Sequence, residues 1–266
     1  VAFSDPCTLI KDKREKLLGA RGERYPCGNG SGKGEYVNRF SDKQQAEYDN
    51  KKMKCSNGSN GKDEGACASF RRLHLCNKNM VKMETTKITD SSKAKNDLLL
   101  DVCMAAKYEG DSIKTHHPQH QEKYDDSASQ LCTVLARSFA DIGDIVRGRD
   151  LFLGHQQRKK YLEERLEKMF ENIKNNNAAK LSELSSEEVR EAWWALNRQH
   201  VWKAITCDAG QNDKYFRNTC NGGEQTKGYC RCNDDKPDDD KPNTDPPTYF
   251  DYVPQYLRWF EEWAED

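Results

Sequence analysis

Apolar residues recur at helical spacing in the stretch SEEVREAWWALNRQHVWKAITC, which spans residues 186–207. Ser185 can cap this helix, because Glu188 stands three residues later and can reach back to the N–H group of the cap. Two apolar stripes follow, formed by Val189, Trp193 and Leu196 and by Trp194, Val201 and Ile205. A helix that is apolar on two sides is normally buried on two sides. We therefore expect this segment to be the central member of a helix bundle.

Three other segments carry a single apolar stripe at the same spacing, over residues 90–108, 127–142 and 155–175. With 186–207 they predict a four-helix bundle. Short helices are expected at 11–18 and within 71–83, and Pro254 begins a last amphipathic helix with Tyr256, Trp259, Phe260 and Trp263 on its stripe. The stretches 110–126 and 233–248 are polar, and we expect both to be exposed loops.

Residues 1–75 lack this periodicity and are rich in cysteine and glycine. Repeated Asn-Gly and Ser-Gly pairs are typical of loops. The predicted fold is therefore mainly α, with a loop-rich, disulfide-stapled subdomain over 1–75 and a helix-bundle subdomain over 76–266.

Charge is unevenly distributed along the 266 residues, although the net charge is only −1. Residues 1–75 contain 15 Lys/Arg and 10 Asp/Glu, a net of +5, whereas residues 207–266 contain 7 and 14, a net of −7. A basic part on a near-neutral chain favours a local anionic partner over nucleic acid, whose binding proteins are usually basic overall.

Eleven cysteines in a polar, loop-rich chain indicate structural disulfides and an oxidising compartment. We assign all of them as candidate disulfide cysteines: Cys7, Cys27, Cys55, Cys67, Cys76, Cys103, Cys132, Cys207, Cys220, Cys230 and Cys232. The odd number leaves one thiol over, which is either free or paired outside this chain. The first four are expected to staple residues 1–75. The last four could instead bind zinc, but their terminal Cys-x-Cys pair differs from the usual Cys-x-x-Cys knuckle, which favours disulfides.

No motif for catalysis or for a cofactor has the context that it needs. The loop GNGSGKG (28–34) has the wrong spacing for a phosphate loop, and Gly34 stands where Ser or Thr would bind magnesium. Pro118 interrupts the helix that would place His116, His117 and His120 together, so a solvated loop is expected there rather than a zinc site. We expect no enzyme activity, cofactor or metal. We expect the chain to contain neither a signal peptide nor a membrane span, because its apolar runs are too short. Asn29 and Asn57 begin glycosylation sequons.

Three basic clusters are candidates for contacting sulfated or carboxylated glycans, because several charge-assisted hydrogen bonds can act together there. They are Lys51, Lys52 and Lys54; Arg71 and Arg72; and Arg158, Lys159 and Lys160. The alternative for each cluster is an ordinary solvated surface.

Several segments together resemble one family. They are LARSFADIGDIVRGRDLFLG (135–154), EAWWALNRQHVWKAITC (191–207), YFRNTC (215–220), CRC (230–232) and PTYFDYVPQYLRWFEEWAED (247–266), with RYPCGNG (24–30) and RRLHLC (71–76) before them. This set is similar to the Duffy-binding-like domain, in particular the alpha class found in malaria-parasite erythrocyte membrane protein 1 variant antigens. The resemblance implies three subdomains, of which the third is absent from this chain.

The resemblance also implies a host-cell adhesion domain on the outer face of the infected red-cell membrane, as part of a larger membrane-anchored protein. The partners that it implies are heparan-sulfate-like chains, blood-group sugars or complement receptor one on red cells, and antibodies. Attachment of uninfected cells, called rosetting, is the expected outcome. The alternative is a structural and antigenic module whose neighbouring domain, or missing third subdomain, binds the receptor. The motifs do not separate these possibilities, because their helical spacing assigns them mainly to packing.

Overall fold

The computed structural model describes residues 5–19, 23–28, 67–85, 91–124, 130–152, 156–175, 181–237, 239 and 241–265. Within those residues the fold is mainly helical, and β-structure is limited to isolated bridges, as the sequence predicts. None of the described helices is long and apolar enough to cross a membrane. The boundary proposed between residues 75 and 76 stays a prediction.

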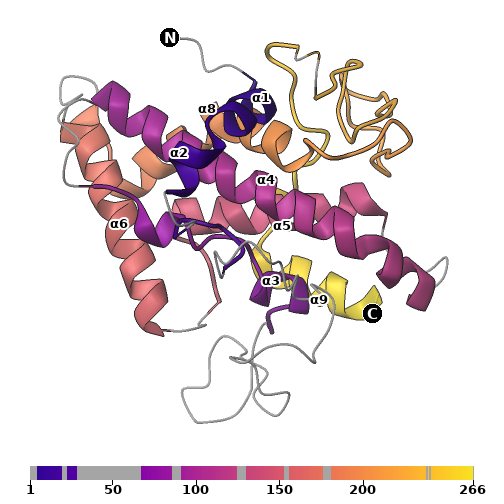
Figure 1. Cartoon of the computed structure of the whole chain (residues 1–266), viewed down its shortest axis with the longest axis horizontal. Coiled ribbons are helices and arrows are strands. Elements are labelled where there is room, and N and C mark those ends of the chain that lie inside the picture. Colours follow the sequence, from indigo (N-terminus) through magenta and orange to yellow (C-terminus); the bar gives the residue numbers. More distant parts are fainter. Residues whose placement is uncertain are drawn as a thin grey trace.

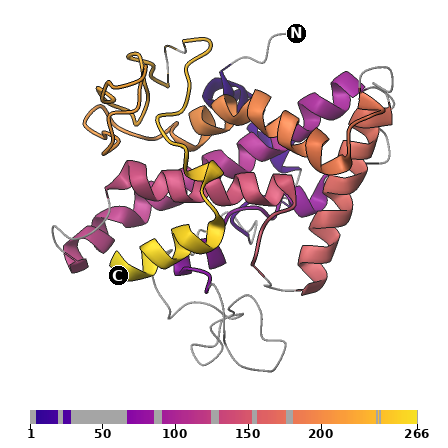
Figure 2. The same cartoon turned by 180° about the vertical axis from the view of Figure 1, so that it is seen from behind.

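Four long helices form the bundle: α4 (Ser91–Tyr124), α5 (Leu131–Arg147), α6 (Gln156–Asn175) and α8 (Ser186–Ile205). In Figures 1 and 2, α4 and α5 run side by side through the middle of the molecule, and α6 crosses one end. Helix α8 contacts the other three. The side chains between the four helices form one hydrophobic core. Each helix contributes an apolar stripe, and burial of these stripes away from water stabilises the bundle.

Helix α8 begins as predicted, with a capping box in which Ser185 and Glu188 each bond the backbone of the other. Trp194 and Trp202 are fully buried, and Phe139 of α5 packs between them at 5.2 and 5.3 Å from their ring centres. Leu196, predicted to be inward, is instead 73% exposed. The helix therefore has contacts on several sides but keeps one face in solvent.

Helix α4 continues well beyond its predicted end at residue 108 and includes Pro118. The polar stretch 110–124 is therefore helical, and the prediction of a loop there was wrong. His116 and His117 are buried on this helix rather than solvated, and the His116 ring bonds the carbonyl of Ser112. The helix thus forms despite the low helix propensity of proline, and the turn before Pro118 is anchored by the buried His116 and His117.

Shorter helices flank the bundle: α1 (Pro6–Asp12), α2 (Arg14–Leu18), α3 (Phe70–Leu73), η1 (Met80–Lys82), η3 (Phe250–Tyr252) and α9 (Gln255–Glu265). Helix α1 packs on α4 and α8, while η3 and α9 pack on α5. On α9, Trp259 is buried as expected, but Tyr256 and Phe260 are 51% and 75% exposed. The exposed side chains of η3 and α9 thus include three aromatic ones, Tyr252, Tyr256 and Phe260.

Four disulfides join described cysteines: Cys7–Cys207, Cys27–Cys76, Cys132–Cys230 and Cys220–Cys232. Cys67 is disulfide-bonded as well, and Cys55 lies outside the described residues. The prediction that Cys7 and Cys27 staple residues 1–75 internally was wrong, because both reach beyond residue 75. Disulfides rather than zinc hold the C-terminal cysteines, as predicted.

Cys103 was wrongly assigned to a disulfide. It is a free thiol in the core, fully buried on α4, where burial raises its pKa. Its position also argues against a partner outside this chain, since the side chain does not reach the surface.

The segment 208–248 was predicted to contain an exposed loop at 233–248. The described part of it is ordered by turns and buried groups: Asp235 is 1% exposed and pairs with Arg231, and Thr248 is equally buried. Most described residues of 233–248 are exposed and lie outside helices, as predicted, but polar contacts that the low apolar content did not indicate bury several of them.

We expect Gly110→Ala to lower the free energy of unfolding by about 1–3 kcal/mol. A Cβ at this position of α4 would lie 2.0 Å from the Ile205 carbonyl oxygen, so α4 and α8 would have to separate. Urea denaturation measures the change. Gly223→Ala is the matched control, because a Cβ there meets nothing within 4 Å. Equal stabilities of the two variants would contradict this close approach.

Candidate functional site

Arg71, a predicted glycan contact on α3, is 1% exposed and lies against α5 and α9. Its Nη2 atom is 2.7 Å from Asp141 Oδ2, and its Nε atom is 2.9 Å from Glu262 Oε1. A third bond runs from Nη1 to Ser138 Oγ at 2.9 Å. The guanidinium is therefore saturated with buried partners.

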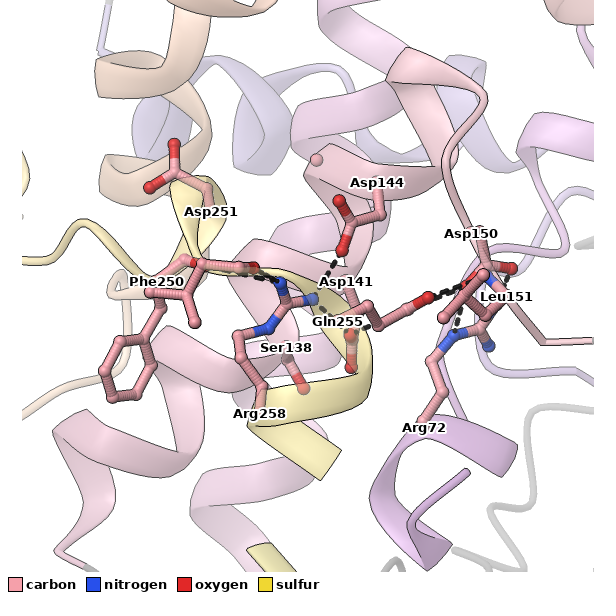
Figure 3. A network of polar contacts seen from close by, with 12 residues as sticks. Arg72, Ser138, Asp141, Asp144, Asp150, Leu151, Phe250, Asp251, Gln255 and Arg258 are labelled. Carbon is pink, nitrogen blue, oxygen red and sulfur yellow. Dashed lines mark hydrogen bonds and ion pairs between the residues drawn. The ribbon is translucent and has the colours of Figure 1, made fainter. Parts of the chain in front are cut away.

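Asp141, at the centre of this arrangement, also accepts from Arg258 of α9 at 2.8 Å and from Gln255 at 3.0 Å. Arg258 bonds Asp144 one turn further along α5. Figure 3 shows Arg258 between these two carboxylates, with Gln255 bridging toward Asp150. We call Arg71, Asp141, Asp144, Arg258 and Glu262 the buried ion cluster.

The electrostatics of the cluster follow from its pairing. Burial alone would raise the pKa of Asp141, but the guanidiniums of Arg71 and Arg258 hold it well below its ordinary value. Burial alone would lower the pKa of Arg71, which Glu262 and Asp141 instead raise. Asp141 and Arg71 therefore stay charged near neutral pH, and removing one would leave the other buried without this partner.

Arg72 is also structural. Its Nε and Nη2 atoms bond both oxygens of Asp150, at 3.2 and 2.5 Å, and its guanidinium stacks on Phe152 at 4.6 Å. Arg71 and Arg72 are therefore no longer candidates for contacting a glycan, because their charges are buried and already paired with carboxylates. Phe70 and Leu73 on either side gave a signal of burial in the sequence, but no signal showed which carboxylates would be the partners.

The cluster at the start of α6 contains both bonded and exposed cations. Arg158 donates to Asn77 Oδ1 at 2.8 Å, and Lys159 donates to the carbonyls of Asp150 and Phe152 at 3.0 and 2.9 Å. Lys160 has a side chain that is 74% exposed, 3.9 Å from Glu164. Lys160 is therefore the member of this cluster that is most available to a ligand.

A basic surface that the sequence interpretation missed lies on α1 and α2. Lys11, Lys13, Arg14 and Lys16 are all exposed there, while Ile10 and Leu17 are buried. We call these four residues the N-terminal basic face. Asp12 and Glu15 lie among them, so the local net charge is +2. The apolar positions at 10 and 17 could have indicated this face.

Other candidates lie outside the described residues: Lys51, Lys52 and Lys54, the sequons at Asn29 and Asn57, and the loop GNGSGKG. Among the residues that are described, no group of three or more His, Cys, Asp or Glu side chains could hold a metal ion.

Arg71→Gln should lower the free energy of unfolding by about 3–5 kcal/mol, because it leaves Asp141 and Glu262 short of a buried cation. Lys160→Gln, a charge loss on an exposed side chain, should change it by less than about 0.5 kcal/mol. Urea denaturation of both variants makes the comparison. If Arg71→Gln is as stable as the wild type, the buried ion cluster contributes nothing to the free energy of unfolding.

Stability should increase as the pH falls from 7 to 5. Burial raises the pKa of Asp101 and of Asp144 to about 6, above the value of 3.8 ordinary for the unfolded chain. The folded protein then binds the proton more tightly, so this stability is fully present below pH of about 4 and is lost as the pH rises through 6.

Each of the two carboxyls contributes about 1 kcal/mol to the increase between pH 7 and 5, and at most roughly 3 kcal/mol once the pH is below 4. Asp101→Asn cannot titrate and should show a smaller increase in denaturation experiments at the two pH values. A flat wild-type profile, or a profile that Asp101→Asn leaves unchanged, would refute the assignment.

The chain matches the Duffy binding domain family over residues 65–258. It is 37% identical to the NTS-DBL1(alpha-1) domain of Plasmodium falciparum membrane protein 1 (PfEMP1) from the varO strain, with a TM-score of 0.68 over 91% of this chain and 51% of that one. The ICAM-1-binding DBLbeta domain of PfEMP1 IT4var13 is 28% identical, with a TM-score of 0.64 over 99% of this chain and 55% of that one.

The chain spans about half the length of these solved relatives. None of the curated proteins compared matches it. The family match covers most of the chain, including the bundle and the first turn of α9, and the family consists of receptor-binding adhesion domains rather than enzymes. The chain therefore belongs to the Duffy binding domain family, as its motifs predict.

Proposed function

We propose that this chain is a host-cell adhesion module of a PfEMP1-like variant antigen, displayed on the outer face of the infected red-cell membrane. Its ligand is an anionic glycan on uninfected red cells, of the heparan-sulfate type, and binding produces rosettes. The observation that carries the proposal is the N-terminal basic face, on which four cationic side chains are exposed along two adjoining short helices.

The physical argument is that sulfates and carboxylates gain most from cations that are free to reorient toward them. A buried, paired guanidinium such as Arg71 offers no donor to a ligand, whereas an exposed lysine or arginine can form charge-assisted hydrogen bonds. We therefore transfer the predicted role from Arg71 and Arg72 to Lys11, Lys13, Arg14 and Lys16. Lys160 and the cluster at residues 51–54 remain candidates beside them.

Blood-group sugars are less favoured partners, since an uncharged sugar gains nothing from a cluster of cations, and complement receptor one stays an alternative. A relative with 28% identity binds ICAM-1, so a protein receptor is a further candidate for this chain. Binding to a glycan that carries no charge would point to the aromatic side chains of η3 and α9 instead.

A second candidate function is a structural and antigenic module whose receptor site lies in a neighbouring domain or in the remainder of the domain. The short span of the chain relative to its solved relatives favours it. Rosette formation or red-cell binding by this chain alone would exclude it.

Neutralising Lys11, Lys13, Arg14 and Lys16 to glutamine should weaken binding to immobilised heparin roughly tenfold and flatten its dependence on salt, because surface charges are screened by added ions. Surface plasmon resonance at several salt concentrations measures both effects. The matched control neutralises four exposed cations in the acidic segment 207–266, namely Lys214, Arg217, Lys227 and Lys236. An equal loss in both variants would mean that only net charge matters and would contradict a specific face.

A further inference from the structure

The disulfide Cys7–Cys207 differs in exposure from the other described disulfides. Both of its cysteines are partly exposed, whereas each of the others contains at least one cysteine that is nearly or fully buried. Cys132–Cys230 and Cys220–Cys232 are at most 3% exposed at either end, and Cys76 is fully buried. Of the described disulfides, Cys7–Cys207 is therefore the one that a dissolved thiol reaches with the least opening of the core.

A buried cation lies against one sulfur of this bond. The Nη2 atom of Arg231 is 3.5 Å from Cys7 Sγ, and Arg231 is only 1% exposed. The guanidinium is held by the Lys203 carbonyl at 2.7 Å and by Thr206 Oγ1 at 2.8 Å. Asp235 lies 3.3 Å from its Nη1 atom and offsets part of its charge. Because a neighbouring cation stabilises a thiolate, Cys7 is the better leaving group of the pair.

We propose that Cys7–Cys207 is a thiol-exchange site at which a small thiol forms a mixed disulfide with Cys207. The external thiolate attacks Cys207 Sγ and forms a new S–S bond. The Cys7–Cys207 bond breaks, and its electron pair stays on Cys7 Sγ as a thiolate beside Arg231. A second thiol then attacks the mixed disulfide, which releases Cys207 as a thiolate and the oxidised form of the reagent.

Exchange at this site would act on the N-terminal basic face. The bond connects α1 to the end of α8 across 200 residues of sequence, and a cross-link over so long a loop restricts the chain strongly. Once it opens, α1 and α2 lose this cross-link to the end of α8, and the backbone and the Cys27–Cys76 disulfide still connect them to the bundle. The effect on glycan binding rests on the proposed function, but the exchange chemistry does not.

The test is reaction of the oxidised protein with reduced glutathione under native conditions, followed by alkylation and mass spectrometry of each cysteine. Glutathione should be found on Cys207, and Cys7 should be alkylated before any of the four cysteines of the two buried disulfides. Cys103 is the internal control: it is fully buried and free, so it is labelled only if the protein unfolds. A glutathione adduct on Cys7, or earlier reduction of either buried disulfide, would overturn the proposal.

Arg231 variants test the role of the cation. Arg231→Gln should slow release of Cys7 by roughly three- to tenfold, and Arg231→Lys should restore most of the rate. If both variants release Cys7 at the wild-type rate, Arg231 has no part in the mechanism. Labelling of Cys103 would show that Arg231→Gln does not fold. In that case the rate of Cys7 release in Arg231→Lys and the cysteine that carries glutathione test the proposal.

Heparin binding of the exchanged protein is measured separately. Opened Cys7–Cys207 with reduced heparin binding supports the regulatory consequence. The same opening with unchanged binding would show that the exchange site is real but does not control a glycan site on α1 and α2.

Discussion

Asp141 is a fully buried carboxylate on α5, and two guanidiniums from distant parts of the chain converge on it. Arg71 comes from α3 and Arg258 from α9, at 2.7 and 2.8 Å. A buried carboxylate is tolerated only when cations and hydrogen bonds replace water. The positions of α3 and α9 against α5 therefore depend on this one charge, and with them the exposed aromatic surface of η3 and α9.

The charged residues of the chain thus do two different things. Buried arginines such as Arg71, Arg72 and Arg258 connect elements far apart in sequence, whereas the lysines of α1 and α2 and Lys160 of α6 lie in solvent. The buried arginines determine how these elements pack together, and their partners are groups of the same chain. Receptor binding is left to the exposed cations, on a scaffold that disulfides hold at several points.

The sequence predicted the bundle well, because apolar spacing reports burial directly; the capping box at Ser185 and Glu188 is one example. It failed where burial was achieved by polar side chains. His116 and Asp235 lie in polar stretches yet are buried through contacts made only in the folded chain. Arg71 and Lys160 are both basic residues in clusters, and only their surroundings separate a structural ion pair from an exposed charge. Cysteine pairing likewise depends on the fold, since no spacing rule connects Cys7 to Cys207.

The central claim, that exposed cations of α1 and α2 bind the receptor while buried arginines hold the scaffold, can be tested directly by lysine footprinting. The folded chain is acetylated with and without a heparin oligosaccharide, and the modification of each lysine is measured by mass spectrometry. The account predicts protection of Lys11, Lys13 and Lys16, with Lys214, Lys227 and Lys236 unaffected. Protection of the second group alone, or of neither, would contradict it.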